Sequence, residues 1–136
     1  MTAVTLDLPL IWAGITAFAV FMYVFMDGFD LGVGILFPFA RGEADRDVMM
    51  NSVAPVWDGN ETWLVLGGGG LMGTFPLAYA VLLEALYLPL IVMLLALVFR
   101  GVAFEFRFKS RANKHWWSVS FAAGSLAATV AQGVVL

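Results

Sequence analysis

The sequence predicts an all-α membrane protein, a polytopic bundle of transmembrane helices. Of its 136 residues, 62% are hydrophobic and only 12% are charged, and the mean hydropathy is +0.91. A soluble domain is about half apolar and about a quarter charged. A small soluble fold hides only about two-thirds of its surface, so water is a poor solvent for this chain.

Four apolar runs predict four spans, over residues 8–39, 52–83, 85–106 and 116–136. The first contains Leu8–Met26, which carries no charge and has the length of about 20 residues that a bilayer requires. As one helix, residues 8–39 would be ~48 Å long at 1.5 Å per residue, against a hydrocarbon core of ~30 Å. We therefore expect tilting or a break, at the glycines or at Pro38.

The other runs have less regular boundaries. Asn51 or Ser52 can cap the second helix, and its glycines at 67–70 would let neighbouring helices approach closely. Glu84 predicts a short turn before the third run, and the Trp116-Trp117 pair predicts an interfacial anchor for the fourth. The fourth run has no polar flank after Leu136, so we expect 1–136 to be one membrane region, the N-terminal part of a longer subunit.

The distribution of cations predicts the orientation. All seven lie after the first run or around the end of the third run: Arg41, Arg46, Arg100, Arg107, Lys109, Arg111 and Lys114. Positively charged loops stay in the cytoplasm. We expect loops 41–51 and 107–115 to be cytoplasmic in a bacterial inner membrane, and the N-terminus to be outside.

Composition also excludes several classes of site. Without cysteine the chain has no disulfide, thiolate metal site or thiol nucleophile, and a single histidine, His115, cannot supply a bis-histidine haem. We interpret His115 as an interfacial residue and the methionines as packing residues. No basic run suggests nucleic acid, and no positive segment near the N-terminus suggests a signal peptide.

Acidic residues are the candidates for chemistry. Asp27 and Asp30 lie near the end of the first run, and Asp58 and Glu61 lie near the start of the second, each pair spaced i, i+3. Residues at this spacing share a helix face. An acid inside a bilayer costs several kcal/mol, so it usually faces the bundle interior or a water-filled cavity. Acids gathered on one side would suit a proton path.

Arg100 and Glu105, at the end of the third run, complete this predicted group, since an arginine can hold a nearby acid ionised. Each residue taken alone has an equally good structural interpretation as a helix cap, a turn residue or an interfacial side chain. Three runs that place acids at one depth favour function, with Asp30 and Asp58 as the leading candidates. We interpret Glu43, Asp45 and Asp47 as a solvated loop.

Three motifs resemble subunit II of the cytochrome bd-type quinol oxidases. They are MDGFDLGVG at 26–34, NSVAPVWDGNETWL at 51–64 and FRGVAFEFR at 99–107, and together they make the resemblance highly specific. The third is closer to the cyanide-insensitive branch of the family. The resemblance covers the whole chain but only the N-terminal helices of the family's subunit.

The resemblance implies an enzyme subunit that takes part in quinol oxidation and the reduction of dioxygen to water. Haem b and haem d, or a further haem b, would be carried by the partner subunit I, and a small accessory subunit and a structural quinone occur in some members. Asp30 and Asp58 would carry protons from the cytoplasm, with Arg100 and Glu105 at matching charged positions. The family often has Asp where Glu105 stands, and Asp27 and Glu61 receive no firm role. No residue here identifies a quinone site.

Two other functions remain open from the residues alone. A secondary transporter or ion channel would also combine glycine-interrupted helices with intramembrane acids. A passive scaffold would use the acids only for assembly. Co-purification with a haem-bearing partner would distinguish an oxidase subunit from a transporter.

Overall fold

The computed structural model describes residues 7–110 and 112–136, which form five α-helices and one 3-10 turn with no strand among them. The helices are α1 (Leu8–Leu36), α2 (Glu43–Val53), α3 (Trp57–Thr74), α4 (Pro76–Lys109) and α5 (Lys114–Val135), and the 3-10 turn η1 (Phe37–Phe39) follows α1. The expected all-α class is confirmed. Arg111 lies outside the described residues.

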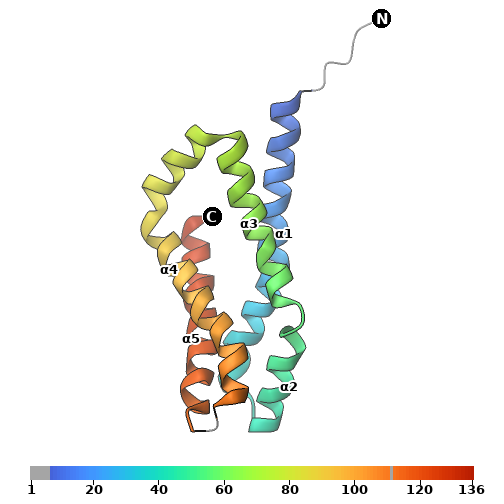
Figure 1. The fold of residues 1–136 in the computed structure, drawn as a ribbon, viewed down its shortest axis with the longest axis vertical. Coiled ribbons are helices and arrows are strands. Elements are labelled where there is room, and N and C mark those ends of the chain that lie inside the picture. The colour runs from blue at the N-terminus through green and yellow to red at the C-terminus, as the bar shows by residue number, and fades with distance from the viewer. Residues whose placement is uncertain (1–6, 111) are drawn as a thin grey trace, which may run out of the picture.

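Three helical segments are long and apolar enough to cross a membrane: Leu8–Phe39, Pro76–Lys109 and Lys114–Val135. The expected count of four spans is therefore not confirmed by the described residues. The helix that would supply the second span, α3, has only 18 residues and begins with Asp58 in its first turn. It nevertheless returns alongside α1, as Figure 1 shows.

The boundary between the second and third expected runs was wrong. The chain turns at Phe75, and Glu84 lies inside α4 rather than in a turn. Proline explains the difference, because Pro76 has no N–H and suits the first turn of a helix, while the residue before a proline avoids helical geometry. Phe75 accordingly has φ −130° and ψ 59°.

The polar segments at the other end of the molecule are more helical than expected. Residues 43–53 form α2 instead of a loop, so Ser52 lies within that helix rather than at the start of the next one. The predicted polar loop before α5 is short as well, because α4 continues to Lys109 and α5 begins at Lys114. The break expected near Pro38 is present as η1.

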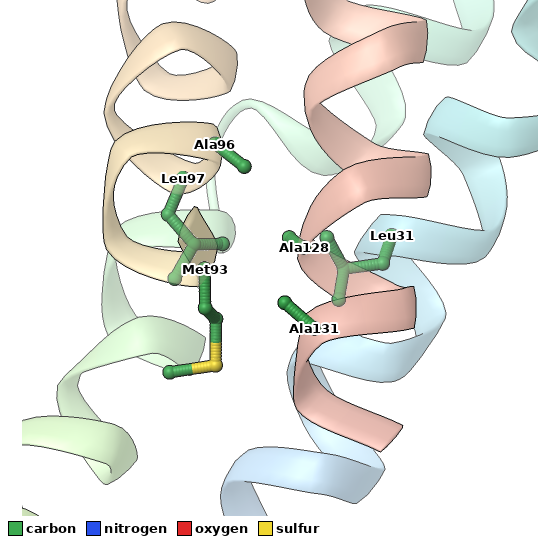
Figure 2. Close-up of a cluster of buried hydrophobic side chains, with 6 residues drawn as sticks. All are labelled: Leu31, Met93, Ala96, Leu97, Ala128 and Ala131. Carbon is green, nitrogen blue, oxygen red and sulfur yellow. The ribbon is translucent and has the colours of Figure 1, made fainter. Parts of the chain in front are cut away.

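Two helix pairs form the bundle: α3 packs along α1, and α4 packs along α5. Contact between α1 and α5 joins the two pairs. Figure 1 shows that α4 bends along its length, and Pro89 lies inside this helix. An interior proline removes a backbone hydrogen bond and kinks a helix. Figure 2 shows the apolar cluster at the join, where Leu31 of α1 lies near Met93, Ala96, Leu97, Ala128 and Ala131 of α4 and α5.

Small residues bring α5 close to its neighbours. A Cβ atom on Gly124 would lie 2.8 Å from the carbonyl oxygen of Ala96 and 3.3 Å from the Cβ of Arg100. One on Gly34 would overlap the side chain of Ser125. These close approaches fix the position of Arg100, which carries the charge described below.

Replacing Gly124 with alanine should therefore push α4 and α5 apart. We expect Gly124→Ala to lower the free energy of unfolding by about 1–3 kcal/mol, as overpacking does. Thermal unfolding of the detergent-solubilised protein measures the change. Gly133→Ala is the matched control, since its Cβ would meet nothing within 4 Å and alanine favours a helix. Equal melting temperatures for the two variants would contradict the close packing.

Candidate functional site: a buried arginine shared by three acids

A buried charged cluster lies where α1, α3 and α4 meet. Asp27, Asp30 and Arg100 each have side chains that are 0% exposed. An arginine Nη1 lies 3.3 Å from Asp27 Oδ1 and 3.1 Å from Glu61 Oε1, and Nη2 lies 4.0 Å from Asp30 Oδ2. One cation is therefore shared by three carboxyl groups from two other helices.

Helix geometry explains how α1 supplies two of these acids. Asp27 and Asp30 are three residues apart, and they continue a buried face that includes Thr16, Ala19 and Tyr23. Asn60 of α3 reaches the same face, and its Nδ2 donates a hydrogen bond of 2.7 Å to Asp30 Oδ2. The pair Asn60-Glu61 thus contacts the cluster at two places, one through an amide and one through an acid.

Aromatic rings brace the arginine. The guanidinium of Arg100 lies 5.5 Å from the centroid of the Phe104 ring, and Trp57 stacks on that ring at 5.0 Å. Gly101 leaves room for Trp57, since a Cβ there would lie 3.1 Å from the indole. A cation over an aromatic face is attracted by the ring quadrupole. This packing holds the charge on α4 against α3.

A cleft of about 520 Å³ between α3 and α4 leads to the cluster from one side. Its walls include Asp58, Glu61 and Glu105. Glu61 is the residue common to the cleft and the cluster, and its side chain keeps 22% of its exposure. Asp58 and Glu105 are exposed, and Glu105 pairs with Lys109.

A second charged group ties α2 to the ends of α4 and α5. Arg107, whose side chain is 0% exposed, lies 3.0 Å from Glu43 and 2.5 Å from Asp47. Lys114 approaches the same two acids at 3.1 and 3.2 Å. The guanidinium of Arg107 also lies 5.1 Å from the Phe37 ring centroid. Glu43 and Asp47 are therefore ion-paired residues of a helix and not loop residues, although the Glu43 side chain remains exposed.

Comparison with known proteins decides the family. Residues 8–136 match the model of the family described as cytochrome bd terminal oxidase subunit II. This chain belongs to that family.

Curated relatives agree with this assignment. The chain is 41% identical over 130 residues to cytochrome bd ubiquinol oxidase subunit 2 of Bacillus subtilis (strain 168), with 92% of this chain and 38% of that protein covered. It is 35% identical over 130 residues to cytochrome bd-I ubiquinol oxidase subunit 2 of Escherichia coli (strain K12), covering 93% and 34%. A probable cytochrome oxidase subunit 2 of Haemophilus influenzae is 43% identical over 94 residues, covering 68% and 25%. The chain spans about a third of the length of the first two relatives.

Within this subunit II chain, the structure divides the six candidate residues into two groups. Asp27, Asp30, Arg100 and Glu61 meet directly, whereas Asp58 and Glu105 lie at the adjoining cleft. Asp27 and Glu61, the weaker candidates from sequence, form the shortest contacts with the arginine. Asp58, a leading candidate, makes no ion pair among the described residues.

The contact of Asn60 with the cluster was not predicted from the sequence, because an uncharged amide is common at helix ends and does not by itself indicate a buried site. A signal was present, since Asn60 and Gly67 are seven residues apart on α3 and are its two buried positions. Gly67 packs against α1, where a Cβ would lie 3.1 Å from Val20. The small residue therefore marks the side of α3 on which Asn60 meets Asp30.

The chain's single histidine is not among the residues of the charged cluster. His115 is exposed in the first turn of α5, beside Trp116, and no group of three or more potential metal ligands occurs in residues 7–110 and 112–136. The chemistry available to the cluster is the binding and release of protons.

The ion pairs of α2 predict a dependence of stability on acid. A hydrogen bond from Arg46 lowers the pKa of Glu43, and one from Arg107 lowers the pKa of Asp47. The folded state therefore binds fewer protons than the unfolded state, whose groups titrate near pH ~4. The stabilisation is complete above that range and is lost as pH falls through the lowered pKa values.

We expect the melting temperature to fall between about pH 5 and pH 3, and the Glu43→Gln, Asp47→Asn double variant to show a smaller fall. Thermal unfolding at a series of pH values at constant ionic strength measures this. Asp45→Asn is the matched control, because Asp45 lies on the same helix and forms no ion pair in the described structure. If the melting temperature of Asp45→Asn depends on pH as weakly as that of the double variant, the pH dependence does not come from the ion pairs of Glu43 and Asp47.

Proposed function

We propose that this chain is part of subunit II of a bd-type quinol:oxygen oxidoreductase, and that its acids bring protons to the oxygen-reducing haem of subunit I. The observation that carries the proposal is the excess of buried acid over base. Asp27, Asp30 and Glu61 surround one cation, so the fully ionised cluster would have a net charge of −2 inside the bundle.

A buried charge without a partner is strongly unfavourable, and an acid in that position takes up a proton instead. The cluster therefore has a reason to bind protons, and Arg100 has a reason to keep at least one acid ionised. A group that alternates between these states can pass protons on. A purely structural ion pair would need only one acid for its arginine.

The cleft supplies the entrance in this proposal. Protons would be received at Asp58 and Glu105, reach Glu61 at the boundary and continue to the acids of α1. One end of the bundle, formed by η1, α2 and the adjoining ends of α4 and α5, carries five cations among the described residues: Arg41, Arg46, Arg107, Lys109 and Lys114. We assign this end to the cytoplasm by the positive-inside rule. The N-terminus is then outside.

The proposed partners follow from the family and the relatives' names. Quinol is the electron donor, as the names of the ubiquinol oxidase relatives state for those proteins. Subunit I would hold haem b and either haem d or a further haem b. In the complete oxidase, the haem reduces dioxygen and this chain's acids supply the protons that enter water.

Neutralising the entrance should slow the enzyme without removing its haem. We expect the Asp58→Asn, Glu105→Gln double variant of the full-length complex to consume oxygen at least about tenfold more slowly, since loss of a proton-transfer group costs roughly 10²–10⁴. Oxygen consumption with excess quinol is measured beside the haem spectrum of the same sample.

Glu84→Gln is the control, because Glu84 is an exposed acid on α4 away from the cleft-lining residues. A double variant that keeps normal turnover and haem content would rule out the entrance. A full-length chain that brings down no haem-bearing partner would instead favour the transporter or channel alternative.

A further inference from the structure

The three acids around Arg100 differ in their other contacts. Asp30 accepts a hydrogen bond from a neutral amide, Asn60, at 2.7 Å, and it lies 4.0 Å from the arginine. Asp27 and Glu61 both approach the same arginine nitrogen, Nη1, at 3.3 and 3.1 Å. Within one cluster, Asp30 therefore contacts a neutral amide, whereas Asp27 and Glu61 contact the charged arginine directly.

The amide of Asn60 favours one charge state of Asp30. An Asn Nδ2 only donates hydrogen bonds, and a carboxylate that accepts such a bond is stabilised in its ionised form. Asn60 is itself buried, with 7% of its surface exposed, so it is not replaced readily by water. Asp30 then serves as the lasting counter-ion of the arginine across 4.0 Å.

The other two acids compete for one donor. Two carboxylates that meet at a single nitrogen repel each other, and such a pair keeps one proton between its members. Their access also differs, since Glu61 borders the cleft and Asp27 is fully buried. A proton that enters at Glu61 and is passed to Asp27 moves from the exposed side of the cluster to its interior.

We infer that Asp27 and Glu61 are the proton-exchanging pair of this cluster, whereas Asp30, fixed by Asn60, is a permanent counter-ion of Arg100. This inference rests on the proposed function and sharpens it, because sequence resemblance alone assigns the relay to Asp30 and Asp58. It makes Asn60 a positioning residue that acts through Asp30.

Other groups also face the cluster. Tyr23 of α1 is buried one turn before Asp27 and is close enough to that carboxyl to interact with it, while its hydroxyl also lies 4.0 Å from the sulfur of Met93. Asp58 stands at the cleft near Glu61. From α5, Gly124 packs against Arg100 and Ser125 against α1 at Gly34, and Ser125 donates its hydroxyl to the carbonyl of Phe121. Among the described residues of α5, none adds a charge to the cluster.

Infrared spectroscopy of the full-length oxidase complex can count the protonated carboxyl groups, because a protonated acid has a C=O stretch that an ionised one lacks. We compare Asp27→Asn, Glu61→Gln and Asp30→Asn, with Glu84→Gln as the control. The expected result is that Asp27→Asn or Glu61→Gln removes the protonated-carboxyl band and slows oxygen consumption at least about tenfold. Asp30→Asn should keep the band.

The amide is tested by a double-variant comparison. Asn60→Leu removes the donor to Asp30, so a new protonated-carboxyl band should appear and the pH profile of turnover should change. In the Asp30→Asn background, Asn60→Leu should have no further effect on either measurement, because its target is already neutral. A purely structural role for Asn60 would give the same loss in both backgrounds.

The outcomes separate this inference from the proposed function. If Asp30→Asn removes the band and Glu61→Gln keeps it, the division of roles is wrong while the proton path stands. If all three variants retain normal turnover with normal haem content, the proton path itself is wrong. Haem content is recorded for each variant, and a sample that lacks haem is replaced by the more conservative Asp27→Glu or Glu61→Asp, which should restore the band.

Discussion

The structure depends on the burial of one positive charge. Arg100 is fully buried, and Asp27, Asp30 and Glu61 are its partners. Removing one member of a buried ion pair costs about 3–5 kcal/mol, because the other charge is left without compensation. The cluster thus fixes how α1, α3 and α4 meet, although each helix is largely apolar.

The same interaction constrains the packing around it. Gly124 lets α5 lie against the backbone of Arg100, and Gly101 lets Trp57 lie against the next turn of α4. In a bilayer the lipid is as apolar as the side chains, so helix association depends on close packing and on polar contacts. In this bundle the glycines allow the close packing, the charged cluster supplies the polar contacts, and both lie at the same level along the helices.

Much of this arrangement could be predicted from sequence. The i, i+3 spacing placed Asp27 and Asp30 on one face of a helix, and hydropathy predicted the spans of α1, α4 and α5. The turn at Phe75 was missed because an apolar run with a proline inside it reads as continuous, while Glu84 looked like a boundary. The choice of Glu61 over Asp58 as the arginine's partner was also unpredictable, because it depends on the rotation of α3 about its own axis.

The long separation of the partners along the chain has a consequence for biosynthesis. Arg100 follows Asp27 by 73 residues. At about 5–20 residues per second, the ribosome needs roughly 4–15 s to reach the arginine after it has made the aspartate. During that interval the hairpin of α1 and α3 carries the three acids of the cluster without their cation, so α1 cannot reach its final depth while its acids are ionised. The nascent chain must hold these acids protonated or near the membrane surface until α4 is delivered.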